Sequence, residues 1–280
     1  FTLVPEEVSN SNLMGGHKLQ LIGELKENIP LVLSTISSFL FNPASTDIQL
    51  KSLRCLQSWI QYGFSLEDGY PILQKVMTLL GDVDLFESAV DVLLESMQQA
   101  AWARYQHYRN ELLTCFTSDA MKEKFELCVA EEDEETARLI AKLLTTFGET
   151  YTDYIVGQLA RPDMYWLMTM IIRLTGFEGF FPIDQEVTEI PLNFWYIMQE
   201  TLFDERILPV KPSAPSETEE LWKYNCGQAA LVIYKELVEI LIRNARYPEE
   251  SVWESWNKGM QSQTRDIAVR KTNSWSRHQG

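Results

Sequence analysis

Residues 46–97 read TDIQLKSLRCLQSWIQYGFSLEDGYPILQKVMTLLGDVDLFESAVDVLLESM. Within this stretch Leu53, Leu56 and Ile60 recur at helical spacing, and a second apolar stripe runs through Trp59 on the same segment. A helix with two apolar faces must be packed from two sides. The stretch therefore predicts a helix that lies between other helices instead of on an exposed surface.

The same stretch predicts where its helices begin and end. Ser45 is suited to an N-cap and Gly63 to a helix stop, while a second helix is expected from about Pro71 to Gly81. A third is expected from Asp84. These helices recur with a step of about 40 residues, the range of HEAT-type repeats. The spacing predicts two helix pairs: 46–62 with 71–80, and 84–98 with 102–116.

The rest of the chain continues the helical pattern and gives almost no strand signal. Further helices are expected at 118–130, 134–148, 162–175, 191–204 and from a capping box at Ser216 to about 246. An irregular loop at 177–190 and a Pro-rich loop at 208–216 interrupt them. We predict an all-α HEAT-repeat α-solenoid of about five to six helix pairs over residues 1–257, without a clear domain boundary. A compact helical domain is the alternative.

The charge balance narrows the class of partner. The chain has 40 Asp and Glu against 24 Lys and Arg, a net charge of -16. Residues 258–280 hold five basic residues and one acidic residue, and are expected to be a polar basic tail or a truncated repeat. Such acidity argues against direct nucleic-acid binding and favours basic protein partners, or simply solubility. No apolar run approaches the roughly 20 residues of a membrane helix, so no membrane insertion is expected.

The sequence offers no recognisable catalytic set, so we expect no enzyme, no cofactor and no metal site. The four cysteines form no CxxC pair and the three histidines are scattered. One acidic run is prominent: Glu131, Glu132, Asp133, Glu134 and Glu135. It predicts a solvated loop before a helix, or an acidic contact for a basic partner. A Mg²⁺ site would need a second acidic motif on a facing helix, and the sequence shows none.

A mixed basic and aromatic cluster at Arg104, Tyr105, Tyr108 and Arg109 is a second candidate. It is typical of an ordinary amphipathic helix with a polar face, and it could also form an RNA patch. The strong acidity of the chain makes the RNA interpretation the weaker one. We therefore treat these four residues as candidates to face a protein partner on a concave surface.

Two groups of residues form motifs that are more specific than helical periodicity. A helix ending in SW-x-Q-x-G precedes an L-F-x-x-A-V helix, and a TG-x-x-G-x-F-P loop precedes an FW helix. In order and spacing these motifs resemble the importin-β superfamily of nuclear transport receptors, in particular the importin 13 and transportin-SR branch. The residues that carry the resemblance are Trp59, Gly63, Leu85, Phe86, Gly176, Gly179, Pro182, Phe194 and Trp195.

The resemblance implies a function. Receptors of this branch are HEAT-repeat superhelices that shuttle between nucleus and cytoplasm with protein cargo. Their implied partners are Ran in its GTP form, basic protein cargo and the Phe-Gly repeats of nucleoporins. The chain would match an internal block of repeats, with the main Ran-contacting repeats before Phe1 and the cargo-binding arch beyond Gly280. A HEAT-repeat scaffold unrelated to nuclear transport is the alternative.

Overall fold

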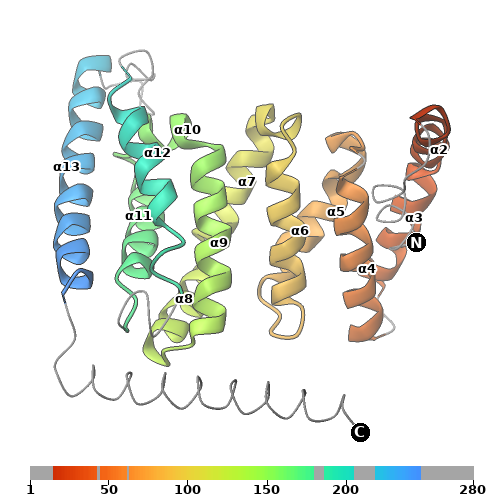
Figure 1. Cartoon of the computed structure of the whole chain (residues 1–280), viewed down its shortest axis with the longest axis horizontal. Coiled ribbons are helices and arrows are strands. Elements are labelled where there is room, and N and C mark those ends of the chain that lie inside the picture. Colours follow the sequence, from red (N-terminus) through yellow and green to blue (C-terminus); the bar gives the residue numbers. More distant parts are fainter. Residues whose placement is uncertain (1–14, 43–44, 62, 180–185, 205–217, 247–280) are drawn as a thin grey trace, which may run out of the picture.

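A computed structural model describes residues 15–42, 45–61, 63–179, 186–204 and 218–246 (Figure 1). Every regular element within these ranges is helical, which confirms the predicted fold class. The helices are α2 (Gly15–Glu27), α3 (Ile29–Phe41), α4 (Thr46–Ile60), α5 (Leu66–Leu79), α6 (Phe86–Gln98), the 3-10 helix η1 (Trp102–Arg104), α7 (Gln106–Phe116), α8 (Asp119–Ala130), α9 (Glu134–Thr150), α10 (Thr152–Val156), α11 (Pro162–Thr175), α12 (Leu192–Leu202) and α13 (Glu219–Asn244).

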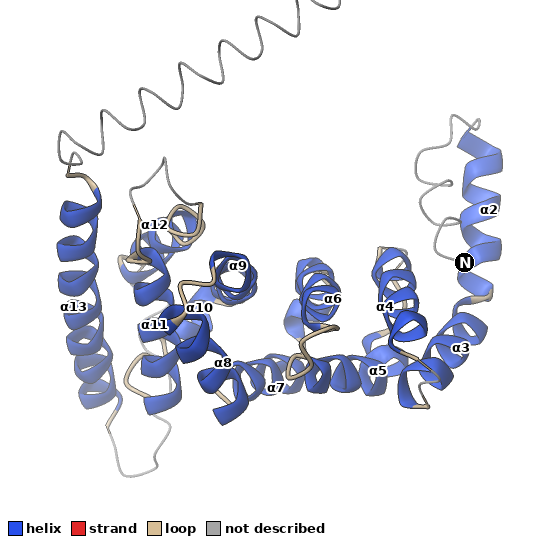
Figure 2. Ribbon diagram, turned by 90° about the horizontal axis from the view of Figure 1, so that it is seen from below, coloured by secondary structure: helices blue, strands red, loops and turns tan. Residues whose placement is uncertain are grey.

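The helices lie in two rows that follow an arc. Helices α4, α6, α9 and α12 contact one another in succession and form one row. The second row includes the contacts of α3 with α5, α7 with α11, and α11 with α13. Figure 2 shows α4, α6 and α9 on the inner side of the arc and α5 and α7 on its outer side. The structure thereby assigns the inner face, which the spacing of helices in the sequence leaves open.

The pairing of the helices differs from the prediction by one helix. Close backbone contacts join α3 to α4, α5 to α6 and α8 to α9, whereas the predicted pairing joined the segments of α4 with α5 and of α6 with α7. A regular alternation of helices has two possible pairings. Spacing alone gives the period but not which neighbour each helix packs against most closely.

The predicted period itself is visible in the contacts between residues 64–77 and residues 102–115. Three hydrogen bonds each span 38 residues. Trp102 Nε1 donates to the Phe64 carbonyl at 3.3 Å, Tyr105 Oη donates to Glu67 at 3.0 Å, and Cys115 Sγ donates to the Met77 carbonyl at 3.7 Å. One repeat therefore follows the next with a constant offset, as nearest-neighbour stacking in a solenoid requires.

Local signals explain several helix ends. Ser45 caps α4 by accepting from the Ile48 N–H, and Gly63 adopts a φ of +70°, a left-handed conformation that glycine reaches without a Cβ penalty. Helix α5 begins at Leu66, not near Pro71, because Ser65 accepts from the Asp68 N–H and starts the helix one turn earlier. Pro71 thus lies inside α5.

Helix α13 also begins later than the capping box suggested. The prediction placed its cap at Ser216, which lies outside the described residues. In the structure Thr218 is the cap, since its hydroxyl accepts from the Leu221 N–H at 3.3 Å. The Pro-rich loop 208–216, Pro182 and residues 258–280 also lie outside the described residues, so the proposed division at 257 stays a prediction.

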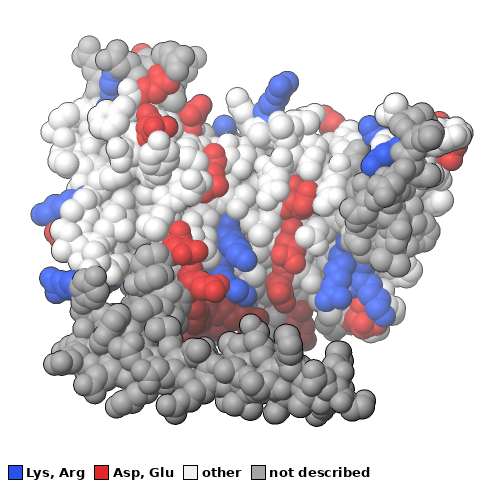
Figure 3. Space-filling view, viewed as in Figure 1, with Lys and Arg blue, Asp and Glu red and all other residues white. Residues whose placement is uncertain are grey.

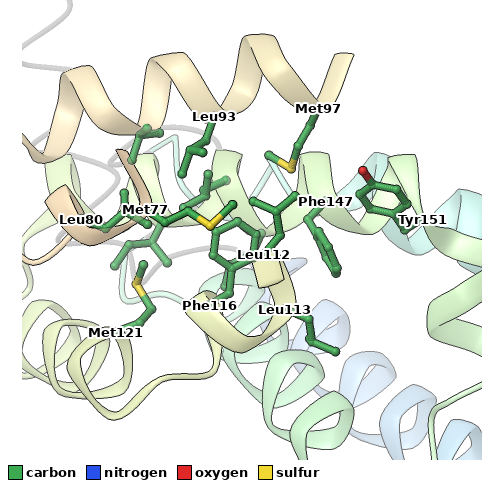
Figure 4. Packing of buried hydrophobic residues seen from close by; sticks show 14 of the residues in the cluster. Met77, Leu80, Leu93, Met97, Leu112, Leu113, Phe116, Met121, Phe147 and Tyr151 are labelled. Atoms are coloured by element: carbon green, nitrogen blue, oxygen red, sulfur yellow. The ribbon is translucent and has the colours of Figure 1, made fainter. Parts of the chain in front are cut away.

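One continuous core runs between the two rows. Figure 4 shows side chains of α5, α6, α7 and α9 meeting at its centre. There Phe116 packs edge-on against Phe147, with ring centroids 5.5 Å apart, and Phe147 contacts Tyr151 in turn. The buried Ser96 and Tyr108 hydroxyls share a hydrogen bond of 2.5 Å. The core is therefore shared between repeats, and the surfaces on either side of it are left for partners.

Candidate partner-binding surfaces

The acidic run 131–135 forms the turn between α8 and α9. Asp133 is the N-cap of α9, where its carboxylate accepts from the Thr136 N–H at 3.1 Å. This bonding at Thr136 holds the pKa of Asp133 below its usual range. Glu132 has a φ of +55°, which reverses the chain between the two helices. Asp133 thus has a structural role, as the solvated-loop interpretation predicted.

The other carboxylates of this loop project outward. Glu131, Glu132, Glu134 and Glu135 are all exposed, and Glu134 accepts from the backbone N–H of Glu186 at 3.1 Å. Across the described part of the chain, no group of three or more acidic, His or Cys side chains could hold a metal ion. No facing acidic motif supports the Mg²⁺ alternative there. Whether the loop contacts a partner stays a prediction.

A cavity of about 420 Å³ lies beside this loop, between the end of α11 and α13. Its lining includes apolar residues together with four glutamates and two arginines: Glu132, Glu178, Glu236, Glu239, Arg173 and Arg243. Both arginines are already engaged. Arg173 forms a bidentate ion pair with Glu126, and Arg243 donates to the Gly176 carbonyl at 3.1 Å. Only Arg173 is paired with a carboxylate, and the four lining glutamates outnumber the remaining cation, Arg243, so the net charge of the cavity lining is negative.

The structure does not bring the basic and aromatic cluster together on one surface. The side chain of Tyr108 is fully buried in the core, so the prediction that it faces a partner is wrong. The guanidinium of Arg109 stacks over the Tyr154 ring at 3.6 Å, and Tyr105 donates to Glu67. Arg104 is exposed. The 3-10 turn at 102–104 breaks the helical register, which is why one face could not be extrapolated across the cluster.

The residues that carry the family resemblance are structural where the structure describes them. Leu85, Phe86, Trp59, Phe194 and Trp195 are all buried in the core. Such burial is the expected role of apolar residues at helical spacing. Gly179 lies in the loop after α11 with a φ of +129°, a conformation open to glycine. Pro182 lies outside the described residues.

The TG pair of the downstream motif ties three helices together. The Thr175 hydroxyl accepts from Trp195 Nε1 at 2.9 Å, and the Thr175 carbonyl accepts from Asn244 at 2.9 Å. A Cβ on Gly176 would lie 2.7 Å from the guanidinium of Arg243, so a larger residue there would displace the end of that side chain. The carbonyls of Thr175 and Gly176 at the end of α11 are therefore capped by side chains of α13.

Two grooves on the outer side of the arc were missed by the sequence analysis. One of about 490 Å³ lies between α5 and the α7–α8 corner, with Met77, Leu80 and Met121 among its lining residues. The other, of about 280 Å³, lies between α3 and α5. Their linings come from helices 30 or more residues apart, so no local pattern in the sequence marks them.

Comparison with known proteins shows which proteins this chain is similar to. No family model matches the chain. Importin-13 from Homo sapiens is 24% identical over 270 residues, and importin-13 from Gallus gallus is 25% identical over the same length. A solved structure of importin-13 in its cytosolic state superimposes with a TM-score of 0.70 at 19% identity, covering 96% of this chain and 33% of that one.

The chain resembles importin-13 in sequence and in fold. Both relatives match 96% of it, and the structural match shows the same helical solenoid fold. The chain is thus similar to importin-13, a nuclear transport receptor, over nearly all of its own length. This confirms the resemblance seen in the motifs. The chain spans about a quarter of the length of the curated relatives it matches.

None of the helices in the described ranges is both long enough and apolar enough to cross a membrane. The candidate partner surfaces on the described residues are the exposed acidic loop, the cavity beside it, the outer grooves and the inner face of the arc.

Proposed function

We propose that this importin-13-like chain is a protein-binding segment of a receptor that carries protein cargo through nuclear pores under the control of Ran-GTP. The observation that carries the proposal is the relationship to importin-13 over 96% of the chain, together with a shared fold over the same extent. On this proposal the protein shuttles between nucleus and cytoplasm.

The mechanism is a change of curvature. In a solenoid each repeat contacts its neighbours, so the arc can bend without breaking the core. Cargo and Ran-GTP would each favour a different curvature, and binding of one would then weaken binding of the other by the same factor. The acidic loop 131–135 and the negative cavity beside α13 support a basic partner surface through charge complementarity. Arg104 stays a candidate contact because its side chain is exposed.

The outer grooves support the proposed passage of the receptor through nuclear pores. Phe-Gly repeats would insert a phenyl ring into an apolar slot between adjacent helices. The groove between α5 and the α7–α8 corner has apolar walls and the volume for such a ring. Met77 and Met121 are among its walls, and flexible thioether side chains adapt well to an aromatic guest.

A binding experiment tests the proposal. The purified chain is immobilised and exposed to Ran locked in the GTP form and to Ran-GDP. In parallel, the chain replaces the matching quarter of human importin-13, and the chimera is assayed for nuclear import in permeabilised cells. Import by the chimera, lost when Ran-GTP is added in excess, supports the proposal. A folded chimera that imports nothing would favour the scaffold alternative.

A further inference from the structure

The charge of Arg109 on α7 has no opposite charge beside it. On the face shown in Figure 3, basic side chains over α4 and α9 lie beside the acidic side chains of α6. Arg109 differs, because it forms no ion pair within the described part of the chain. Burial lowers the pKa of Arg109, and the side chains that act on it electrostatically are Tyr154, Tyr151 and Arg161. None of these is a carboxylate, so the cation has lost water without gaining a partner of opposite charge.

Tyr154 of α10 holds this arginine next to a second one. The Arg109 guanidinium lies over the Tyr154 ring, 3.6 Å from its centroid, and the Tyr154 hydroxyl accepts from Arg161 at 3.1 Å. Arg161 is itself paired with Asp163 through two hydrogen bonds, at 3.0 and 2.5 Å. A guanidinium stacked on a ring keeps its N–H donors in its own plane, so the edge of Arg109 stays open to an acceptor.

Buried donors without an acceptor occur in the same group of helices. Among the described residues, three buried side-chain nitrogen or oxygen atoms have no hydrogen-bond partner: Arg109 Nε, Tyr151 Oη and Trp166 Nε1. Each can donate a hydrogen bond, and they belong to α7, the α9–α10 junction and α11, which contact one another. Tyr151 is only 5% exposed, and burial raises its pKa to about 12, so its hydroxyl stays a neutral donor. Unpaired buried donors destabilise the free chain, and a ligand that brings acceptor oxygens removes that penalty.

We propose that Arg109 and the Tyr151 hydroxyl form a recognition site for one carboxylate, that of an Asp or Glu side chain on a protein partner. Two carboxylate oxygens can accept in parallel from the edge of a guanidinium and still have lone pairs for a hydroxyl. Arg109 is partly exposed, so a partner side chain can reach its guanidinium.

The local charge favours a carboxylate over a phosphate. The two arginines and Asp163 leave the cluster with one net positive charge, which one carboxylate neutralises and the near-dianion of a phosphate monoester exceeds. The chain as a whole carries a net charge of -16. An acidic partner segment is therefore repelled by most of this protein and attracted here, which makes the site selective in position.

Nuclear magnetic resonance of arginine side chains tests the site. The 280-residue chain is isotope-labelled at arginine, and the Nε–H signal of Arg109 is assigned by its loss in Arg109→Lys. The probes are N-acetyl-glutamic acid amide, its neutral counterpart N-acetyl-glutamine amide, and methyl phosphate, at constant ionic strength. The glutamate probe should shift the Arg109 signal with an affinity at least about tenfold higher than the glutamine probe. The signal of Arg54, exposed on α4, should barely move.

Two outcomes of this titration would overturn the proposal. If the glutamate and glutamine probes act alike, or Arg54 responds as strongly as Arg109, no carboxylate site exists there. If methyl phosphate binds more tightly than the glutamate probe, the site recognises phosphate and the assignment to a carboxylate is wrong.

The variant Tyr151→Phe separates recognition from a merely structural role. It removes an unpaired buried hydroxyl and keeps the ring, so the melting temperature of the free chain should stay the same or rise. The affinity for the glutamate probe should nonetheless fall about fivefold, because one donor is lost. Tyr165→Phe, at an exposed position on α11, is the matched control and should change neither quantity. An unchanged affinity in Tyr151→Phe would remove this hydroxyl from the site.

Removing the charge of Arg109 is the complementary test. Binding is followed here by the melting temperature in about 100 mM glutamate probe relative to the same concentration of glutamine probe, because a ligand of the folded state raises it. Arg109→Gln should abolish the difference between the probes, whereas Arg109→Lys, which keeps the charge and loses the planar fork, should retain part of it. An undiminished difference in Arg109→Gln would contradict the proposal. None of these measurements involves Ran or import, so the site can fail or succeed independently of the transport proposal.

Discussion

At the scale of single residues, Asp133 shows how a residue within a conspicuous acidic run can have an ordinary role. Its carboxylate caps α9, and bonding at Thr136 lowers its pKa. A group whose folded pKa is depressed contributes stability that is present above its unfolded pKa. That contribution is lost as the pH falls through the folded value.

We therefore expect Asp133→Ala to lower the free energy of unfolding by about 1 kcal/mol at pH 7, with a smaller effect below about pH 3. The control Asp133→Asn keeps a capping oxygen and should lose only the dependence on pH. Thermal unfolding followed by circular dichroism between about pH 2 and 7 measures both variants. An Asp133→Ala effect that is constant across this pH range would contradict the assigned cap.

Thr175 is the second residue that the structure singles out. Its buried hydroxyl accepts from Trp195 Nε1 and donates to the Ile171 carbonyl. Thr175→Val keeps the shape and leaves the indole N–H without a partner, which should cost about 1 to 3 kcal/mol. Thr175→Ser retains the hydroxyl and should keep most of that stability. Urea unfolding monitored by circular dichroism compares the two, and equal losses would show that the hydrogen bond is unimportant.

At the scale of helices, the approach of α12 to α9 depends on a glycine. A Cβ at Gly148 would lie 2.6 Å from the Phe194 ring, whereas a Cβ at Gly23 in α2 would meet nothing within 4 Å. Gly148→Ala should therefore destabilise the chain by about 1 to 3 kcal/mol through overpacking. Gly23→Ala is the matched control and should stabilise by up to about 1 kcal/mol through helix propensity. Similar effects of both on the melting temperature would argue against close packing at Phe194.

The ends of helices were predictable where the signal is local. Ser45 and Gly63 act through their own side chain and backbone, so the sequence placed the ends of α4 correctly. The predicted start of α5 near Pro71 was wrong because Ser65, six residues earlier, caps the helix. Proline is common in the first turn of helices, but here it lies further along the helix. The prediction that Tyr108 is exposed to a partner was wrong because the 3-10 turn at 102–104 shifts the helical register just before this residue.

Contacts between helices were not predictable in the same way. The acidic positions of α6 can be read from the sequence, yet their place between Arg54 and Lys142 depends on how α4, α6 and α9 pack. The outer grooves and the pairing of α3 with α4 depend likewise on tertiary contacts. Periodicity and motif order were enough to predict the fold class and the related proteins. They were not enough to predict which residues form the grooves and the inner face.

At the scale of the whole molecule, stability should vary along the arc because each helix contacts only its neighbours. Helix α6 contacts α4, α5, α9 and η1, whereas α2 contacts α3. Amide hydrogen exchange measured by mass spectrometry should therefore be at least about 100-fold slower in α6 and α9 than in α2. The same protection in every helix would mean that the described chain unfolds as a single cooperative unit.

Matched core substitutions make this gradient a test of nearest-neighbour coupling. Leu93 of α6 and Ile36 of α3 are both buried, and truncating either to Ala should cost about 2 to 5 kcal/mol. Leu93→Ala should speed exchange in α4, α5 and α9 as well as in α6. Ile36→Ala should speed exchange in α2 to α5 and leave α9 unchanged, because α3 contacts only the nearer helices. If Ile36→Ala instead accelerated exchange in α11 and α13, the arc would behave as a rigid body, and curvature could not couple two partners.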